Sequence, residues 1–256
     1  DPNELNILRN LASLSLQLKH YAQVKKYSQL ILAQSPLDPA ATLMSAWQMM
    51  LDDDEALAKQ SLSELSSALS LLDKNNIAKD QLTSFVQASS EYLQGNHEKA
   101  RQLLLAHIKN FPDDKSALRM LLEMNTDGDM NKKLISLLEN SQKEIITDLH
   151  LSTKLVQLYL SERKILRADT LLSQIAVNFP QHPFVVYLKA TIERLRKNPR
   201  QALALLNELT FSSQPPLYFL LLKGEIQLQL NYLAGAEKTA SLVMADLSQN
   251  IDAYNF

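Results

Sequence analysis

The sequence predicts an all-α fold of stacked helical hairpins, and three observations support that prediction. Apolar residues recur at helical spacing along most of the chain, as in residues 5–16 and 155–160, and strand-like alternation of useful length is missing. The 256 residues include only 4 glycines, where average usage would give about 18, and this shortage disfavours turn-rich β architectures. Prolines fall in short breaks between the helical stripes. Because a residue before proline avoids the α conformation, each break predicts a helix end.

Small residues recur along the chain with a constant period of about 34 residues, which is typical of helical-hairpin repeats. One series of markers keeps this period except for a single longer interval between Ala46 and Ala88, and consists of Ala12, Ala46, Ala88, Leu122, Val156, Ala190 and Gly224. A second series follows the first at a constant offset and is alanine in five of seven places: Val24, Ala58, Ala100, Leu134, Ala168, Ala202 and Ala236. We interpret both series as the points where the two helices of a hairpin approach most closely, since a larger side chain there costs about 1–3 kcal/mol through overpacking. The longer interval predicts an insert, and the polar residues 73–80 fit it.

This pattern resembles the tetratricopeptide repeat (TPR), because Pro36, Pro112 and Pro180 follow the second marker at the same offset that separates the two markers. The resemblance implies a right-handed α-α superhelix, a TPR solenoid of about seven helical hairpins, as a single domain over residues 1–256. The predicted repeats lie near residues 5–38, 39–72, 81–114, 115–148, 149–182, 183–216 and 217–250, with the insert at 73–80. In repeat 115–148, large residues replace the small markers and the proline, so we expect looser packing or a shifted register there.

The family places glycine in the turn between the two helices of a hairpin, and here only Gly95 occupies that position. The other repeats carry polar residues there, namely Lys19, Asp53, Asp129, Arg163, Lys197 and Asn231. After Asp246 the sequence predicts the start of a further helix. We therefore expect the chain to be a fragment of a longer TPR protein that exposes an apolar C-terminal face.

Motifs for catalysis, cofactors and metals are missing from the sequence. There are no cysteines, and the glycines cannot form a phosphate-binding loop. The histidines lack the spacing of a zinc site, and we interpret all five as structural or solvated: His20, His97, His107, His150 and His182. The acidic residues 52–55 are interpreted as a helix cap, and residues 127–131 as a turn that lacks the later ligands of an EF-hand. The sequence predicts no enzyme activity, no catalytic residues, no cofactor and no metal.

Charge and hydropathy exclude two classes of partner. The formal net charge is −2, and the lysine and arginine pairs are short and dispersed, so no nucleic-acid surface is predicted. No apolar run approaches the roughly 20 residues that cross a bilayer, so no transmembrane segment is predicted in this fragment.

The TPR resemblance implies that the first helices of the hairpins line a concave groove that holds a protein partner as a peptide or helix. Outward positions of those helices give the predicted groove residues: Arg9, Trp47, Met50, Phe85, Tyr92, Arg119, Glu123, Tyr187, Arg194, Tyr218 and Glu225. Aromatic residues and arginine dominate interface energetics, and the alternative role of each aromatic is core packing. Residues 9, 13, 43 and 47 do not supply the lysine and asparagine pairs of chaperone-binding TPR domains, so a chaperone carboxylate is disfavoured as the ligand.

Segments 98–104, 110–114 and 201–206 resemble the long TPR proteins of bacterial cell envelopes that are linked to exopolysaccharide export and to the exosortase (PEP-CTERM) system, many of them lipoproteins. This resemblance implies a non-catalytic scaffold in envelope or exopolysaccharide assembly, in the bacterial periplasm or cell envelope rather than the cytoplasm. Two alternatives stay open. One is a self-association module that forms a homodimer through the terminal hairpins or the insert 73–80, and the other is a regulatory arm of a larger protein.

Overall fold

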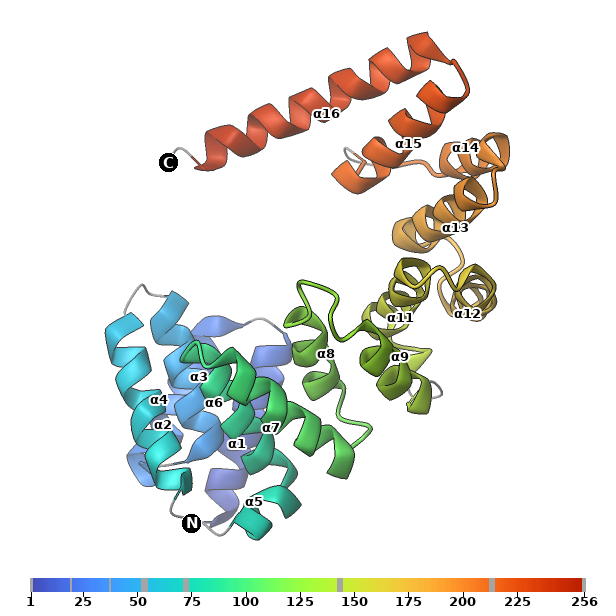
Figure 1. The fold of residues 1–256 in the computed structure, drawn as a ribbon. Coiled ribbons are helices and arrows are strands. Elements are labelled where there is room, and N and C mark those ends of the chain that lie inside the picture. The colour runs from blue at the N-terminus through green and yellow to red at the C-terminus, as the bar shows by residue number, and fades with distance from the viewer. Residues whose placement is uncertain are drawn as a thin grey trace. The chain divides into compact units, whose positions relative to one another are not determined.

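The computed structural model describes residues 2–18, 20–36, 38–51, 55–70, 74–141, 145–211 and 215–254. Within these residues every regular element is a helix, and fifteen helices follow one another through short connections (Figure 1). The chain divides into two compact units, unit 1 (residues 1–127) and unit 2 (residues 128–256). No helix of the described residues combines the length and the apolar character that spanning a bilayer requires.

Unit 1 is built from three helical hairpins and two further helices. Its helices are α1 (Pro2–Gln17), α2 (Tyr21–Gln34), α3 (Pro39–Leu51), α4 (Glu55–Ser70), α5 (Lys74–Lys79), α6 (Gln81–Leu93), α7 (His97–Asn110) and α8 (Lys115–Glu123). The hairpins are α1 with α2, α3 with α4 and α6 with α7, and α8 packs on α7. The insert predicted at 73–80 contains α5, which packs on both α6 and α7 and buries Ile77.

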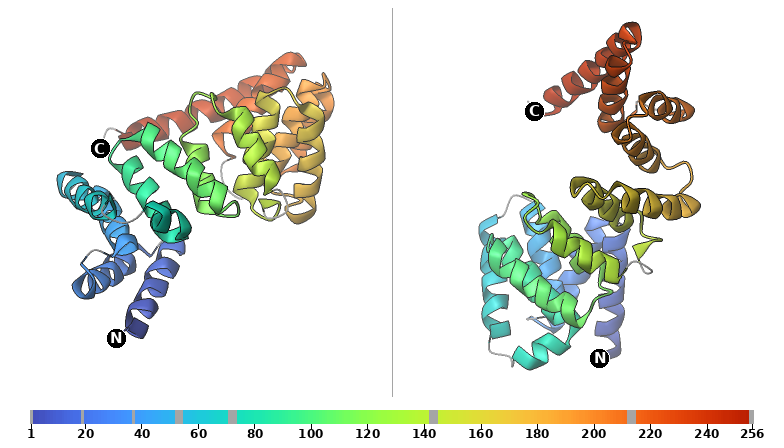
Figure 2. Two further views of the ribbon diagram at one scale, coloured as in Figure 1. Left: turned by 60° about the horizontal axis from the view of Figure 1, so that its bottom comes forward. Right: turned by 45° about the vertical axis from the view of Figure 1, so that its right-hand side comes forward.

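Unit 2 repeats the same arrangement with three complete hairpins. Its helices are α9 (Asn131–Asn140), α11 (Leu149–Ser161), α12 (Ile165–Asn178), α13 (Pro183–Leu195), α14 (Pro199–Glu208), α15 (Leu217–Gln229) and α16 (Leu233–Tyr254). Each hairpin contacts the next, so that α12 packs on α13 and α14 on α15. The views in Figure 2 show these helices side by side in chain order within the unit.

The small marker residues lie where the repeat pattern places them. Ala58, Ala100, Ala168 and Ala202 are fully buried, and so are Ala12, Ala46, Ala88 and Ala190 of the first series. Leu134, the large residue at a marker of repeat 115–148, is also fully buried. The predicted fold of helical hairpins is therefore confirmed, and six hairpins are seen in the described residues, each of them with a buried alanine at one marker or both, whereas α8 and α9 of repeat 115–148 fall in different units.

Turns within the hairpins keep the left-handed backbone even where glycine is missing. Gly95 has φ +83°, while Arg163, Lys197 and Asn231 hold φ between 55° and 65° at the same repeat position. In repeat 115–148 the residue with positive φ is Gly128, one place before the predicted position, so the register is shifted there. Lys19, Asp53 and the predicted acidic cap at 52–54 lie outside the described residues.

An acidic residue begins the first helix of several repeats. Asp80 accepts a hydrogen bond from the backbone N–H of Thr83 at the start of α6, and Asp148 accepts one from Leu151 at the start of α11. His182 fills the same role before α13 through its Nδ1 atom. These side chains satisfy backbone N–H groups that the first turn of a helix leaves unpaired.

Two sequence predictions need correction or remain open. The segment after Asp246 does not start a further helix, because α16 continues without a break to Tyr254. The boundary between the two compact units falls inside repeat 115–148, with α8 in unit 1 and α9 in unit 2. A single solenoid over residues 1–256 stays a prediction.

Candidate partner-binding groove

Unit 1 contains an apolar groove between the first helices of its repeats. The groove has a volume of about 280 Å³ and is formed by α1, α3, α6 and α8. Its lining side chains are Leu16, Leu43, Met44, Trp47, Phe85, Ser89, Tyr92, Leu93 and Met120. Three residues that the sequence predicts for partner binding, Trp47, Phe85 and Tyr92, lie together here.

Helix α6 supplies more of the lining residues than any other helix, because its residues face the groove at helical spacing. Phe85, Ser89 and Tyr92 are separated by four and three positions, so they lie on one face of the helix. Ser89 lies between the two aromatic residues on this face, and its Oγ donates a hydrogen bond to the carbonyl oxygen of Phe85 at 2.9 Å. The surface that α6 presents to the groove is therefore mainly apolar and aromatic.

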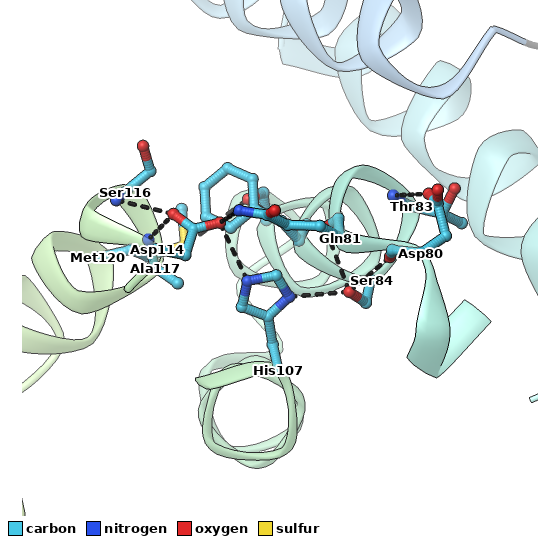
Figure 3. Close-up of polar contacts among 11 residues, drawn as sticks. Asp80, Gln81, Thr83, Ser84, His107, Asp114, Ser116, Ala117 and Met120 are labelled. Atoms are coloured by element: carbon cyan, nitrogen blue, oxygen red, sulfur yellow. Dashed lines mark hydrogen bonds and ion pairs between the residues drawn. The ribbon is translucent and has the colours of Figure 1, made fainter. Parts of the chain in front are cut away.

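A buried polar network holds the walls of the groove in place (Figure 3). Nδ1 of His107 on α7 lies 2.8 Å from Ser84 Oγ on α6, and Nε2 lies 3.1 Å from Asp114 Oδ2. The side chain of His107 is fully buried, and the centroid of its ring lies 5.9 Å from that of Phe85. This histidine is structural, as predicted, and it packs against Phe85, one of the aromatic residues of the groove.

Asp114 connects the network to α8, which carries Met120 on the other wall. Its Oδ1 accepts the backbone N–H of Ser116 and of Ala117, and its Oδ2 accepts from Gln81 at 3.0 Å. Burial alone would raise the pKa of this carboxyl. The hydrogen bonds from His107, Gln81 and Ala117 outweigh that effect, so the pKa of Asp114 is well below its ordinary value.

Trp47 is half-buried and contacts both a neighbouring helix and the groove. Its ring contacts Tyr21 of α2 edge-on, with 5.2 Å between the centroids, while another part of the side chain lines the groove. Such edge-to-face pairs contribute about 0.5–1.5 kcal/mol beyond the area they bury.

The other predicted groove residues of unit 1 do not line the groove. Arg9 pairs with the buried carboxylate of Asp38 at 2.6 Å and so links α1 to the start of α3. Met50 packs against the alanine-rich core between α3 and α4. Arg119 and Glu123 lie exposed on α8.

In unit 2 the predicted residues contact one another, and only Glu225 among them also lines a cavity, the cleft of about 590 Å³ on α15 and α16. Tyr187 and Tyr218 meet edge-on with 4.9 Å between ring centroids, and Phe184 contacts both rings. Burial, and then the neighbouring Tyr187, raise the pKa of Tyr218. Arg194 on α13 forms an ion pair with Glu225 on α15. The predicted aromatic residues of this unit are therefore occupied by contacts with one another, and Arg194 is occupied by its ion pair.

The sequence prediction missed several groove residues, although the repeat positions of most of them could have identified them. Leu16, Leu43, Ser89 and Leu93 occupy the same outward repeat positions as the predicted residues, but they are neither aromatic nor charged. Met120, like Met44, lies one position away from the outward series, and only the packing of the helices shows that it reaches the groove.

The side chains that line the groove are mainly apolar and aromatic. No group of three or more histidine, aspartate or glutamate side chains in the described ranges is arranged to hold a metal ion. The aromatic and methionine side chains can surround apolar groups of a ligand, and methionine adapts its shape readily to different partners.

Three solved structures show the fold to which this chain is similar. The chain of "Functional Characterization of Pseudomonas Aeruginosa pilF" is 15% identical with a TM-score of 0.64, over 88% of this chain and 98% of that one. A tetratricopeptide repeat protein from Parabacteroides merdae is 14% identical with a TM-score of 0.55, over 94% and 93% of the two chains. A chain of the APC/C hetero-tetramer Cut9–Hcn1 is 13% identical with a TM-score of 0.56, over 91% of this chain and 45% of that one.

Sequence comparison alone does not reveal this likeness. No protein-family model matches the chain, and no curated protein matches it in sequence. The structural similarity confirms the predicted fold class, so the chain has the all-α TPR-solenoid fold.

Proposed function

We propose that this chain is a non-catalytic scaffold whose unit 1 groove holds apolar side chains of a partner peptide or helix. The observation that carries the proposal is the cavity of about 280 Å³ lined by aromatic, leucine and methionine side chains from four first helices. Open apolar surface of this kind marks an interaction site more often than a defect of packing. The fold supports the proposal, because a groove between helices is a common receptor for amphipathic helices and peptides.

Selection from a displayed peptide library tests this proposal directly. We expect the purified chain to enrich peptides with aromatic or aliphatic anchors, and Phe85→Ala and Trp47→Ala to weaken the selected peptides by about tenfold or more, as for central interface residues. Tyr187→Ala, an aromatic of the closed surface in unit 2, is the matched control and should leave binding unchanged. Melting curves of each variant separate lost binding from lost folding. Selected peptides that bind equally to all three variants would refute the groove as the site.

The setting that we propose is assembly of the bacterial envelope or of exopolysaccharide. The support is the resemblance of segments 98–104 and 201–206 to envelope TPR proteins, together with two bacterial proteins among the similar structures. Fractionation of cells that produce the natural protein tests the setting. Recovery with a cytoplasmic marker rather than with periplasm or membranes would contradict it.

Self-association is a second candidate, and one observation favours it. A cleft of about 590 Å³ opens on α15 and α16, with Leu228, Leu233 and Met244 among its lining side chains, each more than half exposed. We propose a second copy of the chain as the alternative occupant of this face. Sedimentation across a range of concentrations should then show a dimer that Leu228→Glu dissociates and Leu166→Glu, an exposed leucine on α12, does not. A monomer at every concentration would exclude this candidate.

A further inference from the structure

Unit 2 contains a separate cavity with a chemistry unlike that of the groove. It has a volume of about 340 Å³ and lies between α14, α15 and α16. Its apolar walls include Leu206, Leu209 and the rings of Phe211 and Phe219, which meet edge-on at 4.9 Å. This volume falls within the range of small-molecule sites, about 300–1,000 Å³.

The polar side chains that line this cavity offer hydrogen-bond donors. Lys223 of α15 and Lys238 of α16 both line it, and neither forms an ion pair with any residue in the described part of the chain. Thr239 also lines the cavity, but its hydroxyl is already used, because it donates to Gln227 Oε1 at 2.8 Å.

That hydrogen bond leaves the amide nitrogen of Gln227 as a third donor. With Oε1 held by Thr239, the Nε2 atom lies against Gly235, only 3.0 Å from the place where a Cβ would stand. Gly235 therefore leaves room for this amide. Nε2 has no hydrogen-bond partner among the described residues, so it stays available to an acceptor in the cavity.

Lys223 is half-buried and Lys238 is exposed, and both line the cavity. Burial, and then the charge of Lys238, lower the pKa of Lys223. An anion between the two ammonium groups would remove this repulsion and accept from Gln227. A carboxylate has two oxygens with about four acceptor sites, enough for all three donors.

We propose that this cavity binds an amphipathic carboxylate, with the carboxylate on Lys223, Lys238 and Gln227 and an apolar chain between α14 and α15. The ligand class follows from the lining, which combines Lys223 and Gln227, one helical turn apart on α15, and Lys238 of α16 with leucine and phenylalanine side chains. This site lies in unit 2 and does not depend on the groove in unit 1.

Calorimetric titration with decanoate, below the concentration at which it forms micelles, tests the proposal. We expect saturable binding of one decanoate, and at least about tenfold weaker binding of decanol, which lacks the charge, and of acetate, which lacks the chain. The double variant Lys223→Met/Lys238→Met should lose at least about tenfold in affinity. Lys189→Met, which removes a half-buried lysine of α13 outside the cavity, is the control and should bind as the wild type does.

Gln227→Glu provides a variant that should fold normally and still fail to bind. Its carboxylate can accept the Thr239 hydroxyl as the amide does, while its second oxygen replaces the Nε2 donor and faces the two lysines. We expect an unchanged or higher melting temperature together with loss of decanoate binding. Equal affinity for decanol and decanoate, unchanged affinity in the double methionine variant, or no saturable binding by the wild type would each overturn the proposal.

Discussion

The same repeat positions give an open groove in unit 1 and a closed surface in unit 2. Phe85 and Tyr92 of α6 correspond, three repeats later, to Tyr187 and Arg194 of α13. In unit 1 the two side chains line a cavity with Trp47, whereas in unit 2 Tyr187 packs on Tyr218 and Arg194 pairs with a carboxylate on α15, the first helix of the next repeat. The repeat decides where a side chain lies, and the identity of its neighbours decides whether that surface remains available.

A buried polar link lies beside the walls of the open groove. The link runs from Ser84 through His107 to Asp114 and joins α6 and α7 to the start of α8. In repeats 5–38 and 149–182, which lack this link, the position of His107 is taken by the buried residues Ile31 and Ile175. Weakening the link should therefore affect unit 1 selectively.

The largest effect that we predict is for Asp114→Ala. The substitution removes a helix cap, which contributes about 1 kcal/mol, and leaves His107 buried without its partner, which costs about 1–3 kcal/mol more. We expect the free energy of unfolding of unit 1 to fall by about 3 kcal/mol. Urea denaturation followed by fluorescence of Trp47, the only tryptophan in the chain, measures it.

The matched control for this variant is Asp80→Ala. Asp80 caps α6 through the backbone N–H of Thr83 but does not contact the histidine, so its loss should cost only about 1 kcal/mol. Equal losses for the two variants would show that the His107 link contributes nothing beyond the cap.

Acid should weaken unit 1 through the same carboxylate. Because the pKa of Asp114 is lowered in the folded state, its contribution is present above the unfolded value near 3.8 and is lost as the pH falls below that value. Glu91 acts in the same direction: its burial opposes ionisation, but hydrogen bonds from Lys99, Asn96 and Ser66 lower its pKa. We expect Trp47 fluorescence to report unfolding that begins below about pH 4. Asp114→Asn should flatten this dependence on pH, and an identical profile for the variant would contradict the assignment.

The sequence predicts the spacing of the helices better than it predicts the site. Ala100 and Ala168 are buried as expected, because the close contact between the two helices of each hairpin requires a small residue at that repeat position. Tyr92 and Arg194 show the limit of that reasoning, because they share one repeat position. Tyr92 lines an open groove and Arg194 forms an ion pair, and the side chains of the neighbouring repeat decide between these outcomes. The role of Asp114 was likewise hidden, because its partner His107 replaces an aliphatic core residue and no spacing rule relates the two.

The turns of the hairpins give a smaller difference between the two units. The turn before α7 uses Gly95 at φ +83°, whereas unit 2 places Lys197 at φ +65° in the equivalent turn. Left-handed backbone is strained for residues with a Cβ, so we expect Lys197→Gly to raise the free energy of unfolding of unit 2 by about 0.5–1 kcal/mol. Thermal denaturation followed by circular dichroism detects the shift.

The reverse substitution in unit 1 checks the reason for that gain. No atom lies within 4 Å of the place where a Cβ of Gly95 would stand, so Gly95→Ala changes only the backbone preference. It should destabilise unit 1 by about 1 kcal/mol. A gain for Lys197→Gly without a loss for Gly95→Ala would mean that relief of backbone strain is not the cause.

The smallest effect that we predict concerns the ion pair that closes the surface of unit 2. Arg194 and Glu225 are about one third and more than one half exposed, so water and salt screen their attraction. A double-mutant cycle with Arg194→Ala and Glu225→Ala should give a coupling of about 0.2–1 kcal/mol that decreases as salt is added. A coupling above about 2 kcal/mol would mean that the pair stabilises the fold. With a small coupling, the main consequence of the ion pair is that Arg194 is occupied, as Tyr187 and Tyr218 are by their own contact. The open groove and the closed surface then differ in which side chains they leave available to a partner.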